Sequence, residues 1–600
     1  MNNRTRGGNQ SNQASGQKAN NFKATWGKML NYFRSYWTAG IIALMSAVIG
    51  TVLTLIGPDK LSELTDIVTA GIVTGIDMDA VRTIGFTLVG FYGLSGLLSL
   101  VQGLIMAEVT QRISQKLRQD LSQKINKLPI AYFDNNTTGD ILSRMTNDID
   151  TIAQSLNQSI STLVTATTML VGSLIMMLTT NLIMTATAVL ATLIGIGLMM
   201  LIMSQSQKYF SRQQNDLGAI NGHIEEIYTN QTIVKVYNGE DDARQSFIQI
   251  NKNLQTSGFR AQSLSGLMMP IMTFIGNFGY VAVCIVGAML AFNGSISFGV
   301  IVAFIMYVRY FTQPLSQLAQ AAQSLQSTAA AGERVFDMLE STEMEDESGK
   351  TAKLSTIEGN VEFSNVGFSY PGSDKTVIHD FSAKANAGEK IAIVGPTGAG
   401  KTTMINLLMR FYDVSRGDIK IDGVSTNELK REDVRSQFSM VLQETWIFNG
   451  TVRENLVYSV ENVSDEKVEE ASRAVGLHHF ITTMPDGYDT VLNDQVSLSE
   501  GQKQQITIAR AMIADKPMLI LDEATSSVDT RTELNIQNAM DKLMEGRTSF
   551  IIAHRLSTIK NADLILVMKD GDIIESGTHD DLLEQGTFYA KLYNSQFEAA

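Results

Sequence analysis

The sequence is poor in cysteine, proline and positive charge. It has one cysteine, Cys284, and eight prolines among 600 residues. A single cysteine permits no internal disulfide, and because it lies within an apolar run we expect a small buried or lipid-facing residue. With 47 basic against 61 acidic residues, the formal net charge is −14. This charge argues against general nucleic-acid binding, since that needs a basic face.

The chain also begins without the apolar stretch that a secretory signal peptide requires. Residues 1–21 are mostly Asn, Gln, Gly and Ser with scattered Arg and Lys. This composition is typical of a disordered segment, and we expect a cytoplasmic tail. At 600 residues, the chain is too long for one hydrophobic core and predicts two or more domains.

Long uncharged apolar runs fill the first half of the chain. A membrane-spanning helix needs about 20 predominantly apolar residues. The stretches that meet this requirement are 39–57, 83–106, 158–180, 182–203, 264–292 and 298–320. The first five contain no Asp, Glu, Lys or Arg, and the sixth contains only Arg309. Before them, residues 22–37 mix Lys and Arg with aromatic residues, which predicts an amphipathic helix at the membrane surface.

Basic residues are unevenly distributed among the segments between these runs. The N-terminal segment and the loops 107–157 and 204–263 each carry six, whereas 58–82 carries two and 293–297 carries none. Because basic loops stay on the cytoplasmic side, both chain ends are expected in the cytoplasm.

The two basic loops are long, which predicts that their helices continue well beyond the lipid. In the first loop, residues 133–140 break one helix and begin another, with Thr138 or Asp140 as the expected cap. In the second, 218–228 and 233–237 are similar candidates for contact with a soluble domain below the membrane.

Arg309 stands out because an unpaired charge facing lipid is unfavourable. It is a candidate for lining a substrate cavity or gate, or else it pairs structurally or reaches an interface. The neighbouring helices are rich in Met and poor in charge. Such surfaces favour an amphiphilic or apolar ligand, although ordinary helix packing also accounts for them.

A phosphate-binding motif opens the second half. Residues 395–402 read GPTGAGKT, after a predicted buried strand and before a predicted helix. Glycines let backbone N–H groups wrap phosphates, Lys401 reaches the terminal phosphates, and Thr402 can ligate Mg²⁺. We therefore expect ATP and Mg²⁺ as ligands, with ATP bound by Gly395, Thr397, Gly398, Ala399, Gly400, Lys401, Thr402 and Thr403.

Two further motifs follow the P-loop. An apolar strand over 518–521 ends in Asp522, which would hold Mg²⁺, and Glu523, which would orient or deprotonate the attacking water. Before it, LSEGQ at 498–502 precedes a helical run, so that Ser499 and the N–H of Gly501 can face a phosphate. Alone, such a turn is a plain helix cap, but between the other motifs it favours phosphate binding.

The order of these motifs, together with Gln443, SSVD at 526–529 and His554, resembles the nucleotide-binding domain of ABC (ATP-binding cassette) transporters. With the six spans and the stretch 133–150, the chain is similar to type IV exporters of the B-subfamily multidrug type. The resemblance implies an all-α six-helix transmembrane domain followed by an α/β P-loop ABC ATPase domain. The expected bounds are a tail at 1–21, a transmembrane domain with elbow helix at 22–330, a linker at 331–358 and a nucleotide-binding domain at 359–600.

The resemblance also implies roles for single residues of the ATP site. Tyr370 matches the aromatic residue that stacks on adenine. Gln443 matches the residue that senses Mg²⁺ and the attacking water, so Mg²⁺ would be held by Thr402, Gln443 and Asp522. His554 matches the histidine that contacts the γ-phosphate.

Other matches imply a second half-transporter subunit. Asp529 matches the acid that couples two cassettes, and the signature residues Ser499, Gly501 and Gln502 match those that touch ATP held by the opposite cassette. Where the usual signature has Gly this chain has Glu500, and a carboxylate near polyphosphate is unfavourable unless it points away. With Glu523 and His554 intact, the chain resembles the catalytically competent subunit of heterodimeric bacterial exporters. A homodimer is the alternative.

The expected function is ATP-driven efflux of amphiphilic or hydrophobic compounds, drugs or lipids, across the cytoplasmic membrane by alternating access. A lipid or peptide exporter of the same fold is one alternative, although no peptidase domain precedes the first span. A membrane-tethered ATPase without transport is the other, although six spans with extended inner loops exceed what an anchor needs.

Overall fold

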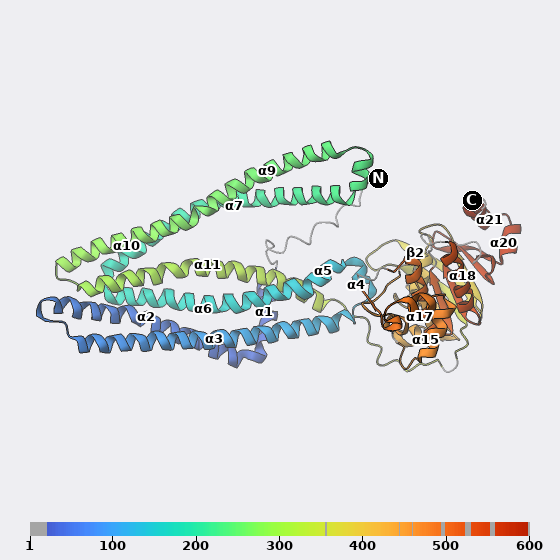
Figure 1. Cartoon of the computed structure of the whole chain (residues 1–600), viewed down its shortest axis with the longest axis horizontal. Coiled ribbons are helices and arrows are strands. Elements are labelled where there is room, and N and C mark those ends of the chain that lie inside the picture. The colour runs from blue at the N-terminus through green and yellow to red at the C-terminus, as the bar shows by residue number, and fades with distance from the viewer. Residues whose placement is uncertain are drawn as a thin grey trace. The chain divides into compact units, whose positions relative to one another are not determined.

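The computed structural model describes residues 21–354, 357–442, 445–458, 460–493, 498–522, 530–552 and 559–597. The chain forms two compact units (Figure 1). The helical unit comprises the chain up to Asn126 and Thr138–Ser341, and the α/β unit comprises Lys127–Thr137 and the chain from Thr342 onward. Residues 1–20 of the predicted tail lie outside the described residues.

Long helices make up the helical unit. Within its described residues, six helical segments have the length and hydropathy to cross a membrane, and this confirms the prediction of six apolar helices. They comprise α2 (Trp37–Thr74), α3 (Met78–Ile125), α6 (Ile149–Thr180), α7 (Leu182–Thr229), α10 (Met268–Phe292) and α11 (Phe298–Glu340). α11 continues as helix through the beginning of the stretch predicted as a linker.

Local sequence signals set the ends of these helices. Asn181 alone separates α6 from α7, and its side chain accepts hydrogen bonds from the N–H groups of Ile183 and Met184. Asp77 caps α3 in the same way, after Gly75 has ended α2 with a positive φ of 98°. Each cap satisfies amide groups that a helix start leaves unpaired.

The inner loops are helical, as predicted. α3 and α7 extend to Ile125 and Thr229, well past the apolar runs. The first loop contains α4 (Ile130–Asn135), α5 (Thr138–Ser143) and a π-helical turn (Arg144–Asp148), so the predicted helix break lies at residues 136–137. The second contains α8 (Gln231–Val236) and α9 (Glu240–Gly266).

The helical unit has two groups of helices. α2, α3, α6 and α11 pack together, whereas α7 and α9 lie side by side and diverge from them (Figure 1). Met177, Met184, Phe304 and Tyr307 belong to the buried cluster that joins α6, α7, α10 and α11. α1 (Phe22–Phe33), in the segment predicted as a surface helix, packs Thr25 and Met29 against Gly332 of α11.

The described α/β unit contains a six-stranded sheet in the order β12-β11-β3-β10-β9-β6 and a four-stranded sheet in the order β2-β1-β4-β5. The short pair β7-β8 stands apart. The strands are β1 (Val361–Ser369), β2 (Thr376–Ala385), β3 (Lys390–Val394), β4 (Arg416–Ile421), β5 (Val424–Ser425), β6 (Phe438–Val441), β7 (Gly450–Thr451), β8 (Val491–Leu492), β9 (Met518–Asp522), β10 (Thr548–Ile552), β11 (Leu564–Lys569) and β12 (Asp572–Gly577).

Apolar residues fill both faces of the larger sheet. Neighbouring strands among β6, β9, β10, β3 and β11 pair in parallel, and such strands read as continuous apolar runs because helices or a second sheet cover both faces. The helices are α12 (Lys401–Leu408), α13 (Arg431–Arg435), α14 (Val452–Val457), α15 (Asp465–Ala474), α16 (His478–Thr483), α17 (Glu500–Ala514), α18 (Thr530–Met544), α20 (His579–Glu584) and α21 (Phe588–Phe597).

Candidate ATP site

The parallel sheet brings the predicted motifs to one edge. β3 and β9 each pair in parallel with β10, so Ile393 and Asp522 both lie opposite Ile552. The P-loop therefore leaves the sheet at the same edge as Asp522. Ligands of parallel α/β sheets bind at this carboxyl edge, because loops and helix N-termini gather there.

The P-loop needs glycine at two closely packed positions. Gly395 has a φ of 156°, and a Cβ there would lie 2.2 Å from the carbonyl oxygen of Met568. Gly400 has a φ of 102°, and its Cβ would lie 2.7 Å from Ile378 Cδ1. The loop is thus held tightly against β2 and β11, with its backbone preceding α12.

Lys401 lies beneath the loop as a buried cation. Its Nζ donates to the carbonyl oxygens of Gly395 at 2.8 Å and Pro396 at 3.1 Å, and the residue is 9% exposed. Burial lowers the pKa of Lys401, while the nearby charge of Asp522 opposes that shift. A buried ammonium with carbonyl partners at a helix start fits an anionic polyphosphate.

The first turn of α12 carries two threonines with different environments. Gly400 precedes the helix and provides no side-chain cap, so the first amide groups are not capped from that position. Thr402 is exposed, whereas Thr403 is buried and its hydroxyl lies 3.0 Å from the hydroxyl of Tyr370. Thr402 and Asp522 offer the hydroxyl and carboxylate oxygens that Mg²⁺ prefers.

Tyr370 belongs to an aromatic cluster beside the P-loop helix. Its ring meets Tyr412 edge to face, with centroids 5.2 Å apart, and Phe368 at 4.9 Å. The half-buried ring of Tyr370 is therefore oriented by two aromatic neighbours and by Thr403. Sequence reasoning identified Tyr370 and Thr403 but not the neighbours that hold them.

The signature segment begins α17 with a capping box. The Ser499 hydroxyl accepts from the Gln502 N–H, and the Gln502 side chain accepts from the Ser499 N–H at 2.9 Å. Ser499 is exposed and Gly501 is buried. The Ser499 hydroxyl accepts a hydrogen bond in this cap, so it can still donate one to a ligand. Glu500 pairs with Lys503 at 2.7 Å and has a largely exposed side chain.

Several predicted residues lie outside the described part of the chain: Gln443, Glu523, Asp529 and His554. Gln443 follows the end of β6 and His554 follows the end of β10, whose carboxyl ends are at the same sheet edge as Asp522. Their roles stay predictions.

Arg309 is exposed on α11 in the single chain, away from the buried Tyr307 and Val308. Gln313 and Gln317 are exposed as well. Intervals of four residues place all three on one helix face. No ion pair of Arg309 occurs among the described residues of the helical unit.

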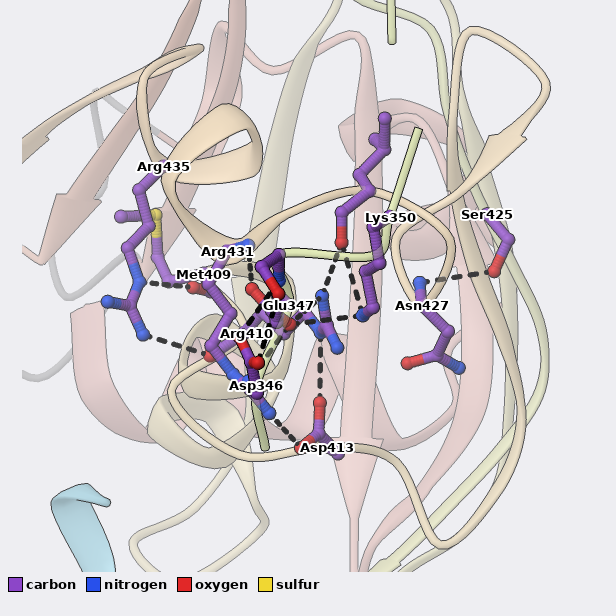
Figure 2. A network of polar contacts seen from close by, with 12 residues as sticks. Asp346, Glu347, Lys350, Met409, Arg410, Asp413, Ser425, Asn427, Arg431 and Arg435 are labelled. Carbon is purple, nitrogen blue, oxygen red and sulfur yellow. Dashed lines mark hydrogen bonds and ion pairs between the residues drawn. The ribbon is translucent and has the colours of Figure 1, made fainter. Parts of the chain in front are cut away.

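An ion network that includes residues directly after the P-loop helix was not predicted from the sequence. Glu347, after the end of α11, lies among Arg410, Arg431 and Lys350, each about 3.0 Å from its carboxylate (Figure 2). Asp413 pairs with both arginines. Burial alone would raise the pKa of Glu347, but hydrogen bonds from Arg431 and Lys350 and the charges of Arg410 and Arg431 lower it on balance. Only an unusual density of Arg and Asp after the P-loop hinted at this network.

The sequence predicted that the first inner loop contacts the soluble domain, but not the residue pair that makes the contact. The Tyr412 hydroxyl donates to the carboxylate of Asp134 in α4. Burial and this hydrogen bond raise the pKa of Tyr412, so the hydroxyl stays a donor. α4 is thereby part of the α/β unit rather than of the helical unit.

Membrane-length helices on the same chain as this phosphate cradle define an ATP-driven membrane protein. Two family models match the chain: the ABC transporter transmembrane region over residues 41–315 and ABC transporter over residues 378–526.

Relatives of known sequence agree. A fatty acid ABC transporter ATP-binding/permease protein of Mycobacterium bovis is 45% identical over 86% of this chain and 82% of its own length. An uncharacterized ABC transporter ATP-binding protein of Bacillus subtilis, YfiC, is 39% identical over 97% and 96%. The ATP-dependent lipid A-core flippase of Escherichia coli is 33% identical over 85% and 88%.

The chain belongs to the ABC transporter family, as a half-size exporter of the type IV class. It is a multi-pass membrane protein and an ATP-hydrolysing translocase that acts as a dimer.

Proposed function

We propose that this chain is one half of an exporter that moves amphiphilic compounds, foremost lipids, across the cytoplasmic membrane by alternating access. The observation that carries this proposal is the presence, on one chain, of six membrane-length helices and a phosphate cradle around Lys401. The fatty acid and lipid A-core relatives favour a lipid among amphiphilic substrates, and drugs are the second candidate. We take 22–330 as the transmembrane domain, 331–358 as the linker and 359–600 as the nucleotide-binding domain.

The nucleotide chemistry follows from the residues of the site. P-loop N–H groups and Lys401 bind the triphosphate, and Tyr370 stacks on adenine. Glu523 orients or deprotonates the attacking water, with His554 at the γ-phosphate. Thr402, Asp522 and Gln443 together offer the oxygen ligands that suit Mg²⁺, which would neutralise phosphate charge. Hydrolysis of this kind depends on positioning and charge stabilisation more than on covalent chemistry.

The dimer completes each site, with Ser499, Gly501 and Gln502 reaching the ATP of the opposite cassette and Asp529 coupling the two cassettes. We propose a heterodimer, because Glu500 replaces the signature Gly while Glu523 and His554 are present. The pairing of Glu500 with Lys503 directs one carboxylate charge toward an ammonium of its own helix. A homodimer is the alternative.

Orientation follows from the distribution of basic residues, which favours cytoplasmic chain ends and cytoplasmic α4 and α8. Within the membrane, the face of α11 that carries Arg309 and two glutamines is unfavourable against hydrocarbon and suits a water-filled cavity. Because Arg309 is the only charge in the six predicted spans, its complement is an anionic headgroup. We propose that Arg309 contacts the headgroup of the substrate.

Transport by the purified complex in vesicles tests this function. In Glu523→Gln, ATP-dependent accumulation of a fluorescent fatty acid is expected to stop, and hydrolysis to fall by about 10² or more, as loss of a general base does. Glu469→Gln, which removes an exposed carboxylate paired with Arg473 on α15, is the control. Hydrolysis by Glu523→Gln near the parent rate would contradict the assigned role.

The same assay examines Arg309. Arg309→Gln is expected to slow transport of the anionic fatty acid by about tenfold, the size of one hydrogen bond to a charged group, and to spare an uncharged amphiphile. Arg309→Lys should retain much of the transport. Equal effects on charged and uncharged substrates would refute headgroup recognition.

A further inference from the structure

Five residues directly after the P-loop helix contact both α4 of the first inner loop and the linker that follows α11. This segment, Met409–Asp413, is here called the junction. We propose that Tyr412 of the junction is a positioning residue, which links the adenine-facing ring of Tyr370 to α4 of the first inner loop. The inference rests on the proposed stacking of adenine on Tyr370.

Tyr412 is fixed at both ends of its side chain. The residue is 7% exposed, and its ring lies edge to face with Tyr370 at 5.2 Å and with Phe368 at 5.5 Å. Its hydroxyl donates to Asp134 of α4. A hydrogen bond to a carboxylate is stronger than one between neutral groups, so a displacement of α4 moves the Tyr412 ring with it.

The orientation of the Tyr370 ring is constrained by its contacts, so it changes when Tyr412 moves. Its hydroxyl lies 3.0 Å from that of Thr403, in the first turn of α12. Its ring is held by Tyr412 on one side and by Phe368, at 4.9 Å, on another. Because close-packed groups have discrete arrangements rather than a continuous range, the tilt of Tyr412 selects the orientation of Tyr370.

The linker after α11 is anchored to the same junction. Arg410, which adopts a left-handed backbone with a φ of 51°, pairs with Glu347 at 3.0 Å (Figure 2). The Met344 N–H donates to the Lys127 carbonyl oxygen at 2.9 Å. Lys127 follows α3 and Met344 follows α11, so the segments that follow these two helices contact each other within the α/β unit.

The junction therefore receives both connections within five residues of the end of the P-loop helix. The linker holds the Arg410 side chain through Glu347, whereas Tyr412 is the residue of the junction that contacts α4. Nucleotide binding and movement of the first inner loop are linked through the ring and the hydroxyl of Tyr412. Substitutions can remove the hydroxyl alone or the whole ring.

The hydroxyl is tested by Tyr412→Phe in the full-length complex in lipid nanodiscs. Hydrogen exchange of peptides covering residues 127–137 is measured with and without a non-hydrolysable ATP analogue and Mg²⁺. In the parent protein the analogue is expected to slow exchange in α4, and in Tyr412→Phe this response is expected to disappear. Tyr488→Phe is the matched control, because it removes a tyrosine hydroxyl of the same unit whose partner is His478 of α16.

The ring is tested by Tyr412→Leu. The KM for ATP is expected to rise by about threefold to tenfold, the size of one aromatic pair contact, with kcat at saturating ATP changed by less than about twofold. Tyr412→Phe should restore the KM of the parent protein. A Tyr412→Leu variant with parent KM would overturn the role of the ring.

The pairing itself is tested by Asp134→Ala. Alone, it should abolish the exchange response of α4 as Tyr412→Phe does, and the double variant should behave as either single one, because both remove the same bond. Additive effects, or a response that persists in Tyr412→Phe, would overturn the link. Loss of transport with an intact exchange response would refute the proposed transport function and leave the junction standing.

Discussion

At the residue scale, the α/β unit uses a largely buried carboxylate, that of Glu347 with a 13% exposed side chain, where its linker enters. The Arg410 side chain is 4% exposed and depends on Glu347 and Asp413 for its ion pairs. Removing one partner of a buried ion pair is strongly destabilising because a charge is left uncompensated. The linker residue Glu347 is therefore part of the folded core of the unit rather than a flexible connector.

Glu347→Ala is expected to lower the stability of the α/β unit by about 3 kcal/mol. Hydrogen exchange of β3 and β9 in the full-length protein measures this loss. Because the folded pKa of Glu347 lies below its ordinary value, the contribution is present above pH ~4.3 and is lost as the pH falls through the folded pKa. Exchange protection should fall with acid more steeply in the parent than in the variant.

Glu343→Gln is the control for this prediction. Glu343 is an exposed neighbour in the linker whose 3.9 Å ion pair with Lys127 is weak, so its removal should change stability by less than about 0.5 kcal/mol. Equal losses in the two variants would show that burial of Glu347 is not what stabilises the unit.

At the element scale, the start of α17 serves two purposes. Ser499 closes a capping box with Gln502, and the same hydroxyl is the proposed contact to ATP of the opposite cassette. α14 begins with an equivalent capping box at Thr451 and Glu454. Comparing substitutions at the starts of α17 and α14 therefore distinguishes the effect of losing a helix cap from the effect of losing a contact to ATP.

Ser499→Ala and Thr451→Ala should each lower stability by about 1 kcal/mol. In the proposed heterodimer, Ser499→Ala should also weaken nucleotide retention at the companion's site by about tenfold, the size of a hydrogen bond to a charged group. Hydrolysis at the site of Glu523 should stay near the parent rate. A tenfold fall in hydrolysis with Ser499→Ala alone would instead indicate a homodimer, in which every site uses this signature.

At the scale of the whole molecule, α8 presents an apolar surface at the end of α7 and α9. Ile233, Val236 and Tyr237 are 57%, 69% and 80% exposed in the single chain. Clustered apolar residues on a water-facing surface mark an interaction site. The sequence predicted that 233–237 contacts a soluble domain, and since the chain acts as a dimer, we expect that domain to be the one of the second subunit.

Val236→Asp is expected to place a charge in that contact and to reduce substrate-stimulated hydrolysis by about tenfold, as an uncompensated interfacial charge does. Hydrolysis rates with and without lipid measure the effect. Ile574→Asp, which makes the same change at an exposed residue of β12, should leave stimulation intact. Full stimulation in Val236→Asp would exclude α8 from the dimer contact.

Much of the architecture could be predicted from local patterns. The bilayer thickness sets a minimum apolar length, so uncharged runs predict α2, α3, α6, α7, α10 and α11. The P-loop was predictable because its glycines, Lys401 and flanking strand and helix are contiguous. The end of β9 at Asp522 was predictable for the same reason.

Pairings between distant residues could not be predicted in this way. Tyr412 and Asp134 are 278 residues apart, and nothing near either residue specifies the other. Glu347 reads as one of several acids in a charged linker, and only its ion pairs with Arg410, Arg431 and Lys350 distinguish it.

The sequence by itself determined that this chain crosses a membrane with six helices and carries a nucleotide-binding cassette, because helix length, strand burial and phosphate cradles are encoded by neighbouring residues. Only the tertiary structure decided how α4 and the linker attach beside the P-loop helix. Those attachments depend on which surfaces the fold brings into contact. A single hydroxyl or carboxylate that is largely removed from water then contributes more to stability than the same group on the surface.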